Sequence, residues 1–364
     1  MDSFAFIIHP IDPKRDVSRK FPLLGRILTE RQIDFFSTFF PPVYISEVEG
    51  IVSQATGKQI RGWLLACPYT PRRMLTLPER TVYRKITQTG HLAERLGAQI
   101  LGLGAFTSVV GDAGITIAKW LDIPVTTGDS YTIAIAVQSI RRAAEIMDIS
   151  MPNATAAVVG ATGAIGRVCA ELLAGEVGRL LLIARDRTRL EELRTRLKSG
   201  ARAELVISTE MSALADAQLI LTVTSAVHQV IRPEHIQPGS VICDVARPRD
   251  VSAMLAAARD DILVIDGGMV DVPGRVDFHF NFGFPPGKAY ACMAETIALA
   301  LEGRFEDYTL GKEISRQQVE EITSMAEKHG FRLSGFRSFE KEVTLEQIEA
   351  VRARTRAARR PKTR

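Results

Sequence analysis

Short apolar runs alternate with charged, helix-like segments through the middle of the chain. Six runs rich in Val, Ile and Leu, the composition of buried strands, lie at residues 155–159, 180–184, 203–207, 218–223, 240–245 and 262–266. Helical patterns follow the first two runs, at about residues 165–174 and 186–198. Strands that alternate with helices predict a parallel sheet with helices on its faces. Six such strands predict one doubly wound α/β domain over residues 151–285.

A glycine-rich turn joins the first of these strands to the first helix. Its glycines follow the spacing G-x-x-G-x-x-G at Gly160, Gly163 and Gly166. Glycine permits a tight turn and close approach of the backbone to a pyrophosphate, while the helix N-terminus offers unpaired N–H groups. We therefore predict a Rossmann dinucleotide-binding domain with cofactor contacts from Gly160, Thr162, Gly163, Ala164, Ile165 and Gly166.

The end of the second strand indicates which cofactor binds. NAD-selective domains carry an acid here, whereas the 2′-phosphate of NADPH requires a cation. This chain has Arg185 in the acid's place and Arg187 close by, which favours NADPH; two ordinary surface arginines are the alternative. Asp186 is interpreted as the N-cap of the next helix. Thr224 and Ser225 follow the fourth strand, where small residues flank the nicotinamide ribose.

Residues 1–128 mix short apolar runs with helical patterns and predict an N-terminal α/β substrate domain. Apolar residues at helical spacing then predict a bridging helix over residues 129–150. Two domains joined in this way should leave a cleft at the carboxyl ends of the strands, where ligands of open α/β sheets bind.

Phenylalanine occupies every second position over residues 277–284, the period of a strand with one apolar face. Residues 286–350 predict a helical C-terminal segment. The last fourteen residues, 351–364, carry seven Lys or Arg and no acid, so we expect a disordered basic tail.

Cys292 is the cysteine best placed for chemistry. It lies near the start of a predicted helix, where the helix dipole and Lys288 would stabilise a thiolate nucleophile; a small buried core residue is the alternative. Cys169 and Cys243 fall at predicted core positions, and Cys67 is the remaining rival. Their spacing suggests neither a zinc site nor a disulfide framework, and we expect no metal.

Composition restricts the function further. The 364 residues, 46% of them hydrophobic, suffice for two domains, and no apolar run approaches a membrane span. The N-terminus lacks the features of a signal peptide, so we expect a cytoplasmic protein, and no nucleic-acid-binding module is present in the pattern.

An ordered set of motifs resembles the long-chain acyl-[acyl carrier protein] reductases of the cyanobacterial hydrocarbon pathway. The motifs are Arg15-Asp-Val-Ser-Arg19, Ala55-Thr-Gly-Lys58, Gly102-Leu-Gly-Ala-Phe-Thr-Ser108, Thr126-Thr-Gly128, Val158-Val-Gly-Ala-Thr-Gly163 and Ala291-Cys-Met-Ala-Glu295. The resemblance implies reduction of a long-chain acyl thioester to fatty aldehyde by NADPH, with Cys292 holding the acyl group covalently. It also implies an acyl carrier protein or CoA thioester as substrate.

The resemblance leaves several features open. Thr107 and Ser108, ahead of Ser130, are candidates to stabilise the oxyanion of the reaction, or they cap turns. The family has Asn where this chain has Asp129, and residues 271–287 match the family poorly. An aldehyde-consuming enzyme and a second copy of the chain are potential partners. Five basic residues could form a cationic docking face for an acidic carrier protein: Arg72, Arg73, Arg80, Arg84 and Lys85. The alternative is an ordinary solvated helix face.

Two other functions compete with acyl reduction. A shikimate-type dehydrogenase acting on a small hydroxy or amino acid would need a Lys–Asp pair for proton transfer, for which Lys58 and Asp112 are candidates. In a nucleotide-sensing protein without catalysis, Cys292 would be inert.

Overall fold

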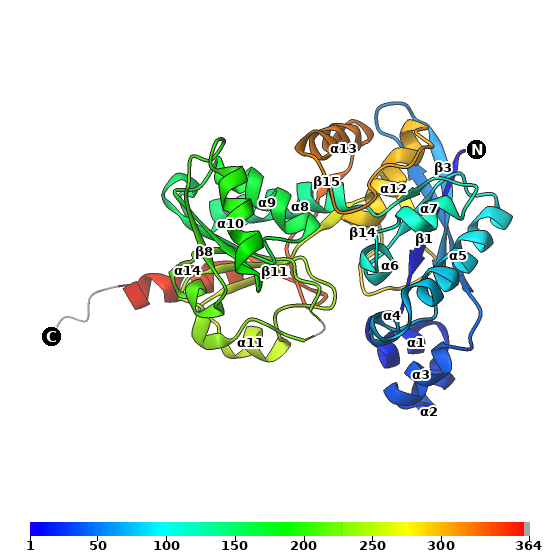
Figure 1. The fold of residues 1–364 in the computed structure, drawn as a ribbon, viewed down its shortest axis with the longest axis horizontal. Coiled ribbons are helices and arrows are strands. Elements are labelled where there is room, and N and C mark those ends of the chain that lie inside the picture. The colour runs from blue at the N-terminus through cyan, green and yellow to red at the C-terminus, as the bar shows by residue number, and fades with distance from the viewer. Residues whose placement is uncertain (227, 360–364) are drawn as a thin grey trace. The chain divides into compact units, whose positions relative to one another are not determined.

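The computed structural model describes residues 1–226 and 228–359. The chain forms two compact units (Figure 1). The first unit contains Met1–Tyr131 and Val270–Ser334, and the second contains Thr132–Met269 and the chain from Gly335 onward. The division falls inside helix α8 (Asp129–Ile146), which corresponds to the bridging helix expected over residues 129–150.

The second unit is built on a sheet of six parallel strands in the order β11-β10-β9-β6-β7-β8. This is the doubly wound order, with the reversal between β6 and β9, so the predicted Rossmann fold is confirmed. The strands are β6 (Thr155–Val159), β7 (Arg179–Ile183), β8 (Glu204–Ser208), β9 (Leu219–Thr222), β10 (Val241–Asp244) and β11 (Leu263–Asp266).

Helices cover this sheet because their apolar residues recur at helical spacing. Helix α9 (Ala164–Ala174) contacts β6 and β7, and α10 (Arg187–Leu197) contacts β7 and β8. Leu190, Leu193 and Leu197 form the buried stripe of α10. The unit also contains α11 (Ala253–Ala258), the hairpin of β16 (Arg337–Ser338) and β17 (Lys341–Glu342), and the 3₁₀ turns at Met151–Asn153, Met211–Asp216 and Pro233–His235.

Helix α14 (Leu345–Arg359) corrects the prediction of a disordered basic tail for residues 351–359. Ile348, Val351 and Thr355 are buried, at spacings of three and four residues, and anchor the helix to the second unit. The intervening arginines face outward, and Arg352 forms an ion pair with Asp148. Residues 360–364, the rest of the expected tail, lie outside the described residues.

The first unit contains a mixed six-stranded sheet in the order β13-β2-β3-β1-β4-β5. Strands β1, β3, β4 and β5 are parallel, while β2 runs antiparallel to β3 and β13 antiparallel to β2. The expected N-terminal α/β architecture is therefore present. The strands are β1 (Ser3–Ile8), β2 (Val43–Val52), β3 (Gln59–Ala66), β4 (Leu101–Leu103), β5 (Val125–Thr126) and β13 (Gly274–Asp277).

Alternate residues of these strands serve two different cores. Ala5 and Ile7 join a buried cluster with residues of α5 (Glu79–Leu96). Phe6 points to the opposite face, which α12 (Ala291–Glu302) covers. Gly102 of β4 permits this close packing, because a Cβ there would lie 2.1 Å from the Oγ1 of Thr296 and 2.4 Å from the ring of Phe6.

The segment from 270 to 334 belongs to the first unit, although the sequence analysis divided it between residues 151–285 and 286–350. Strand β13 extends the first sheet through β2, and α12 packs on that sheet while α13 (Arg316–His329) packs on α12. A small sheet is added by β12 (Met269–Asp271), β14 (Lys288–Tyr290) and β15 (Arg332–Leu333). The pairing of β13 with β2 therefore places the boundary between the two units near residue 270 and not at residue 285.

The predicted strand over residues 277–284 is wrong, because β13 ends at Asp277 and a loop follows. His279 and Gly283 have φ values of +46° and +100°, which interrupt an extended backbone. The alternating phenylalanines pack on one another instead of on a neighbouring strand.

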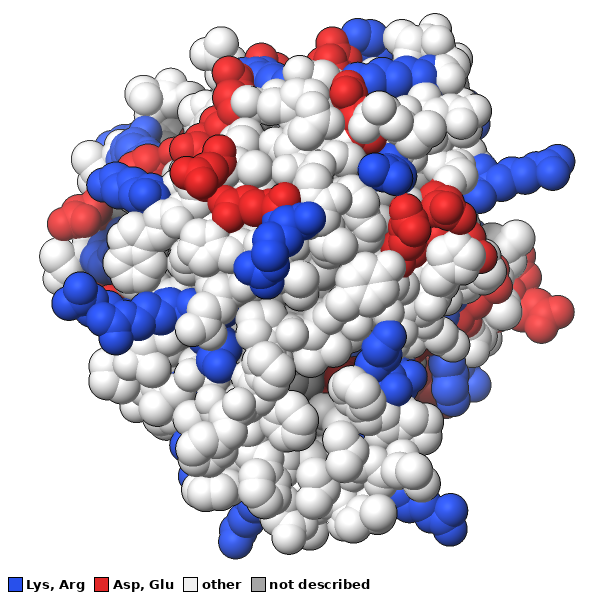
Figure 2. Space-filling view, turned by 90° about the vertical axis from the view of Figure 1, so that its right-hand side faces the viewer, with Lys and Arg blue, Asp and Glu red and all other residues white. Residues whose placement is uncertain are grey.

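Short helices complete the first unit. Helices α1 (Pro13–Lys20), α2 (Pro22–Ile27) and α3 (Glu30–Ser37) form a cluster at one end of it, at the bottom in Figures 1 and 2. The others are α4 (Pro71–Thr76), α6 (Phe106–Val109) and α7 (Ile115–Lys119).

Candidate active site

Cys292 is the second residue of α12, near the helix start as the sequence predicted. Tyr290 occupies the N-cap position, with φ −69° and ψ 148°. Cys67, Cys169 and Cys243 are fully buried, whereas Cys292 is partly exposed. Of the four thiols, that of Cys292 is therefore the one open to a substrate.

The turn after β5 lies directly against Cys292. Gly128 has φ +76°, a conformation that glycine adopts readily. A Cβ at Gly128 would lie 2.3 Å from the Cα of Cys292 and 2.5 Å from its carbonyl oxygen. Glycine is thus required here both for its backbone conformation and for the close approach to Cys292.

Glu295, one turn after Cys292, fixes α12 to this turn. Its buried carboxylate accepts hydrogen bonds from the Oγ1 of Thr126 at 2.5 Å, the Oγ1 of Thr309 at 2.8 Å and the backbone N–H of Tyr131 at 2.8 Å. Burial raises the pKa of Glu295, and these hydrogen bonds oppose the rise. Ser130 joins the same network through a hydroxyl contact of 2.8 Å with Thr309.

The electrostatic surroundings of the thiol differ from the sequence-based expectation. Burial, and next the charge of Asp129, raise the pKa of Cys292 to about 12. Lys288, expected to stabilise a thiolate, instead donates to Asp271 at 2.6 Å and to Ser334 at 2.5 Å. The resting thiol therefore keeps its proton at neutral pH, and its activation requires a base.

Asp129 has the properties of such a base. It is the first residue of α8, follows Gly128 directly and is 8% exposed. Burial, together with the nearby charge of Glu295, raises the pKa of Asp129 to about 7. A carboxyl group with a pKa near 7 can both accept and return a proton at neutral pH.

The sequence analysis did not assign roles to Asp129 and Glu295, although both stood within motifs that it quoted. Glu295 ends the Ala-Cys-Met-Ala-Glu motif, and Asp129 follows Thr-Thr-Gly. Their spacing along the chain gave no sign that they meet, because 164 residues separate Glu295 from Tyr131, to which it is hydrogen-bonded.

Thr107 and Ser108 lie in α6, beyond the carboxyl end of β4. Their hydroxyls donate to backbone carbonyls three residues earlier, at 2.7 Å each. The backbone N–H of the preceding Phe106 donates to the Nε2 of His9, a buried residue after β1 that the sequence analysis missed. Both hydroxyls cap the local turn, and a role for them at an oxyanion stays a prediction.

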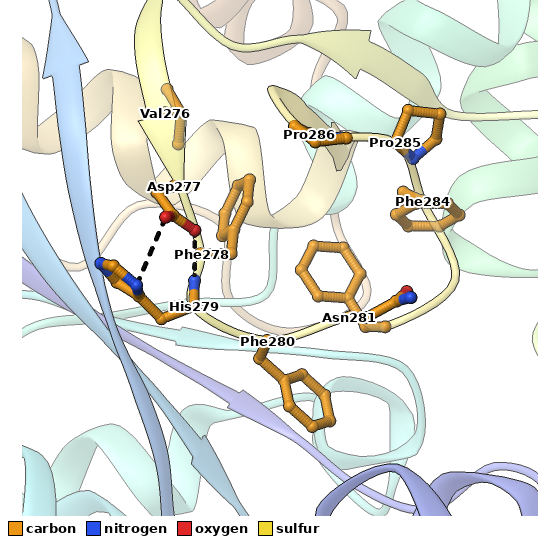
Figure 3. A pocket seen from close by; sticks show the side chains of 10 residues that line it. Val276, Asp277, Phe278, His279, Phe280, Asn281, Phe284, Pro285 and Pro286 are labelled. Carbon is orange, nitrogen blue, oxygen red and sulfur yellow. Dashed lines mark hydrogen bonds and ion pairs between the residues drawn. The ribbon is translucent and has the colours of Figure 1, made fainter.

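The loop after β13 surrounds a cavity of about 380 Å³ in the first unit (Figure 3). Its rings form a ladder in which Phe282 lies 5.1 Å from both Phe278 and Phe284, and Phe284 lies 4.5 Å from Tyr290. Tyr290 is the N-cap of α12, two residues before Cys292. The ladder therefore connects the cavity wall to the helix start that carries the thiol.

His279 lies in this loop and is among the residues that line the cavity. Its ring contacts Asp277 and Glu49 at 3.3 Å each, and about half of its side chain is exposed. His279 therefore lies among exposed acidic side chains in contact with solvent.

In the second unit, the glycine turn has the geometry of a dinucleotide site. Gly160 has φ +85°, and Gly163 is the N-cap of α9. A Cβ at Gly166 would lie 2.2 Å from the carbonyl oxygen of Gly160, so the helix can approach the turn this closely only with glycine. Ala164, Ile165 and Gly166 form the first turn of α9, whose N–H groups suit a pyrophosphate.

Arginines surround the end of β7. Arg185 and Arg187 are exposed there, and Asp186 accepts from the backbone N–H of Arg189 at 3.1 Å as the N-cap of α10. The guanidinium of Arg189, which the sequence analysis overlooked, donates to the carbonyl of Thr162 in the glycine turn at 3.3 Å. Three arginines therefore lie around the end of β7, close to the glycine turn.

Thr224 and Ser225 follow β9, as predicted. The buried carboxylate of Asp250 accepts from the Oγ1 of Thr224 and the Oγ1 of Thr222, each at 2.5 Å, which holds this strand end in place. Ser225 is exposed. Asp250, absent from the sequence prediction, therefore positions the residues expected at the ribose.

The Lys58–Asp112 pair required by a shikimate-type mechanism is not formed within the described residues. The Nζ of Lys58 lies 2.6 Å from Asp2 and donates to the carbonyl of Leu301. The carboxylate of Asp112 accepts from Thr116. Each side chain thus has another structural role.

The Glu295 network generates a stability prediction. Replacement of Glu295 by Ala leaves buried donors without an acceptor, so the free energy of unfolding should fall by about 3 kcal/mol. Urea unfolding followed by circular dichroism measures this change. Glu306→Ala removes an exposed partner of Arg304 and should cost less than about 1 kcal/mol. Equal losses in the two variants would contradict a structural role for Glu295.

Comparison with known proteins adds to this geometry. Residues 141–266 match the family model for shikimate / quinate 5-dehydrogenases, a range within the second unit. The chain is 32% identical over 353 residues to aminotransferase PigE of a Serratia species, an alignment that covers 95% of this chain and 41% of PigE. The chain thus spans less than half the length of that relative.

A second relative matches over its whole length. The chain is 29% identical over 346 residues to a long-chain acyl-[acyl-carrier-protein] reductase of Synechococcus elongatus, which covers 90% of this chain and 98% of the reductase. Among solved structures, L-tryptophan dehydrogenase from Nostoc punctiforme aligns with 98% of this chain and 88% of its own, at 12% identity and a TM-score of 0.42. The predicted resemblance is therefore confirmed, and the chain is similar along its length to a long-chain acyl-[acyl-carrier-protein] reductase.

Proposed function

We propose that this protein reduces a long-chain acyl thioester to an aldehyde with NADPH, through an acyl group held on Cys292. The observation that carries the proposal is the position of Cys292, the partly exposed thiol of the chain, at the start of a helix fixed against the 126–128 turn. The reductase relative and the glycine turn of the second unit support it further.

The first step transfers the acyl group. The Sγ of Cys292 attacks the thioester carbonyl carbon, a new carbon–sulfur bond forms, and the bond to the carrier sulfur breaks. Asp129 takes the thiol proton of Cys292 and returns it to the departing thiolate, so the net charge is conserved. The unpaired N–H groups of the first turn of α12 suit the oxyanion that forms, together with the predicted Thr107 and Ser108.

The residues of the second unit fit NADPH. Gly160, Gly163 and the first turn of α9 would hold its pyrophosphate, and Arg185, Arg187 and Arg189 its 2′-phosphate. When bound, this cofactor supplies the hydride that reduces the acyl carbon. Collapse of the reduced intermediate breaks the carbon–sulfur bond and releases the Cys292 thiolate, which takes up one proton from water, with Asp129 as the relay.

The substrate must offer a long apolar chain and a thioester. The ring ladder from Phe278 to Tyr290 supplies apolar surface next to Cys292 for the acyl chain. The acyl carrier protein named in the reductase relative is the donor that we favour, and CoA is the alternative. Basic residues on α4 and α5, the docking candidates named above, include the exposed Arg72, Arg80 and Arg84.

Cys292→Ala tests the covalent step. With a long-chain acyl carrier protein thioester and NADPH, wild type should form aldehyde, and without NADPH it should gain the mass of one acyl group. The variant should lose the adduct and at least about a thousandfold in rate. Intact-mass spectrometry and aldehyde detection measure both. Cys67→Ala, which removes a fully buried thiol, should retain both activities; aldehyde formed by Cys292→Ala would exclude the mechanism.

Asp129→Asn tests whether Asp129 accepts the proton of Cys292 or only affects Cys292 through its charge. Wild-type acylation should rise with pH through about 7, since the pKa of Asp129 is raised to about 7 and only its ionised form accepts the thiol proton. The variant should acylate about a hundredfold more slowly at pH 7. If Asp129 acted only through its charge, which raises the pKa of Cys292, its removal would make acylation faster. Single-turnover acylation from pH 5 to 9 decides between them.

Arg185→Asp tests the cofactor assignment. Loss of the guanidinium and gain of an acid should lower the ratio of kcat/KM for NADPH over NADH by at least about tenfold. Arg196→Asp, at an exposed position of α10, serves as the matched control and should leave the ratio unchanged. An unaltered preference in Arg185→Asp would remove Arg185 from the site.

A further inference from the structure

Helices α2 and α3, the residues next to them and the start of β2 expose a dense group of apolar side chains. Of the fifteen large hydrophobic residues that are exposed in the described chain, eight fall between residues 21 and 44. We call them the apolar tip: Phe21, Leu23, Ile27, Phe35, Phe36, Phe39, Phe40 and Tyr44. Leu23 and Ile27 are 72% exposed and Phe39 71%. Such concentrated exposure marks a binding surface.

The tip residues gather into one surface. The ring of Phe35 lies 5.4 Å from that of Phe36 and 5.6 Å from that of Phe39. The opposite side of α3 supplies the anchor, because Ile33 and Asp34 are buried and Asp34 accepts from Thr70 at 2.5 Å. The helix is therefore held with its phenylalanines directed outward.

The charges on helices α1 to α3 are mostly positive. Lys14, Arg26 and Arg31 are exposed, and within the described residues none of them forms an ion pair. Of the acids on α1 and α3, Asp16 pairs with Arg19, whereas Glu30 is exposed; Glu47 and Glu49 add negative charge near Tyr44, at the β2 side of the tip. Figure 2 shows the bottom of this face as largely uncharged, with Lys and Arg at its edge and the acidic side chains higher up.

We propose that the apolar tip inserts into the surface of a bilayer that contains anionic lipids. Apolar side chains on short helices with a basic rim are the composition of segments that lie in the membrane interface. Among the described helices none is long and apolar enough to cross a membrane, so the attachment is to one leaflet.

The basic rim strengthens this attachment. Each Lys or Arg near an anionic leaflet is attracted to it, and the attraction weakens as salt screens the charges. Apolar insertion and charge attraction together give stable binding where either alone is weak. The proposal goes beyond the reaction proposed above and does not depend on it, because it concerns residues outside the site.

Vesicle co-sedimentation tests the proposal with the full chain and without substrate or cofactor. Wild type should sediment with vesicles of phosphatidylcholine and phosphatidylglycerol, and less with phosphatidylcholine alone or at high salt. Phe35→Ser/Phe39→Ser should weaken binding roughly tenfold or more, and Arg26→Glu/Arg31→Glu should abolish the preference for anionic vesicles. Met254→Ser, at an 81% exposed apolar residue of the second unit, should bind like wild type.

Two outcomes would overturn the proposal. Wild type that stays in the supernatant with anionic vesicles, or a Phe35→Ser/Phe39→Ser variant that sediments like wild type, excludes membrane insertion through the tip. A wild-type dimer in light scattering that becomes a monomer in that variant, without vesicle binding, would assign the tip to a second copy of the chain. Unchanged thermal unfolding of the variants shows that folding is not the cause.

Discussion

The buried carboxylate of Glu295 is the contact on which the candidate site depends. A carboxylate removed from water requires hydrogen-bond donors, and here they come from the end of β5, the start of α8 and the segment that follows α12. These segments do not follow one another directly in the sequence, and the Glu295 side chain holds all three of them in place relative to α12. The close contact between Gly128 and Cys292 follows from this arrangement.

That arrangement has an electrostatic consequence. Two acids beside the Cys292 thiol oppose its ionisation, whereas a helix N-terminus alone would favour it. The helix start therefore does not produce a thiolate at rest in this protein. In the mechanism proposed here, the helix start offers N–H groups to the charge that develops on a substrate, and Asp129, whose pKa burial also raises, transfers the proton.

The Rossmann half was predictable because its signal is local. Each buried parallel strand is a continuous apolar run, and the glycine turn is a contiguous motif. The N-capping role of Asp186 was equally predictable, because an N-cap side chain accepts a hydrogen bond from a backbone N–H only three residues further along the chain. The site in the first unit was not predictable beyond Cys292, because Glu295 acquires its role only through partners from other segments. In the second unit the same is true of Asp250.

Two errors share one physical cause. Alternating phenylalanines predicted a strand, but without a neighbouring strand their rings packed on one another in a loop. An arginine-rich terminus suggested disorder, but Ile348, Val351 and Thr355 bury one side of a helix beneath those arginines. In both segments the structure depends on tertiary contacts. Neither amino-acid composition nor the spacing of apolar residues predicts such contacts.

The six parallel strands of the second unit all lie within an insertion between residues 131 and 270 of the first unit. During synthesis, the six parallel strands of that insertion are complete before β13 and α12 have left the ribosome. The N-terminal sheet meanwhile lacks both its last strand and the helix that covers Phe6, so its apolar face stays open until the segment 270–334 arrives. Cys292 can therefore reach the 126–128 turn only after the whole insertion has been synthesised.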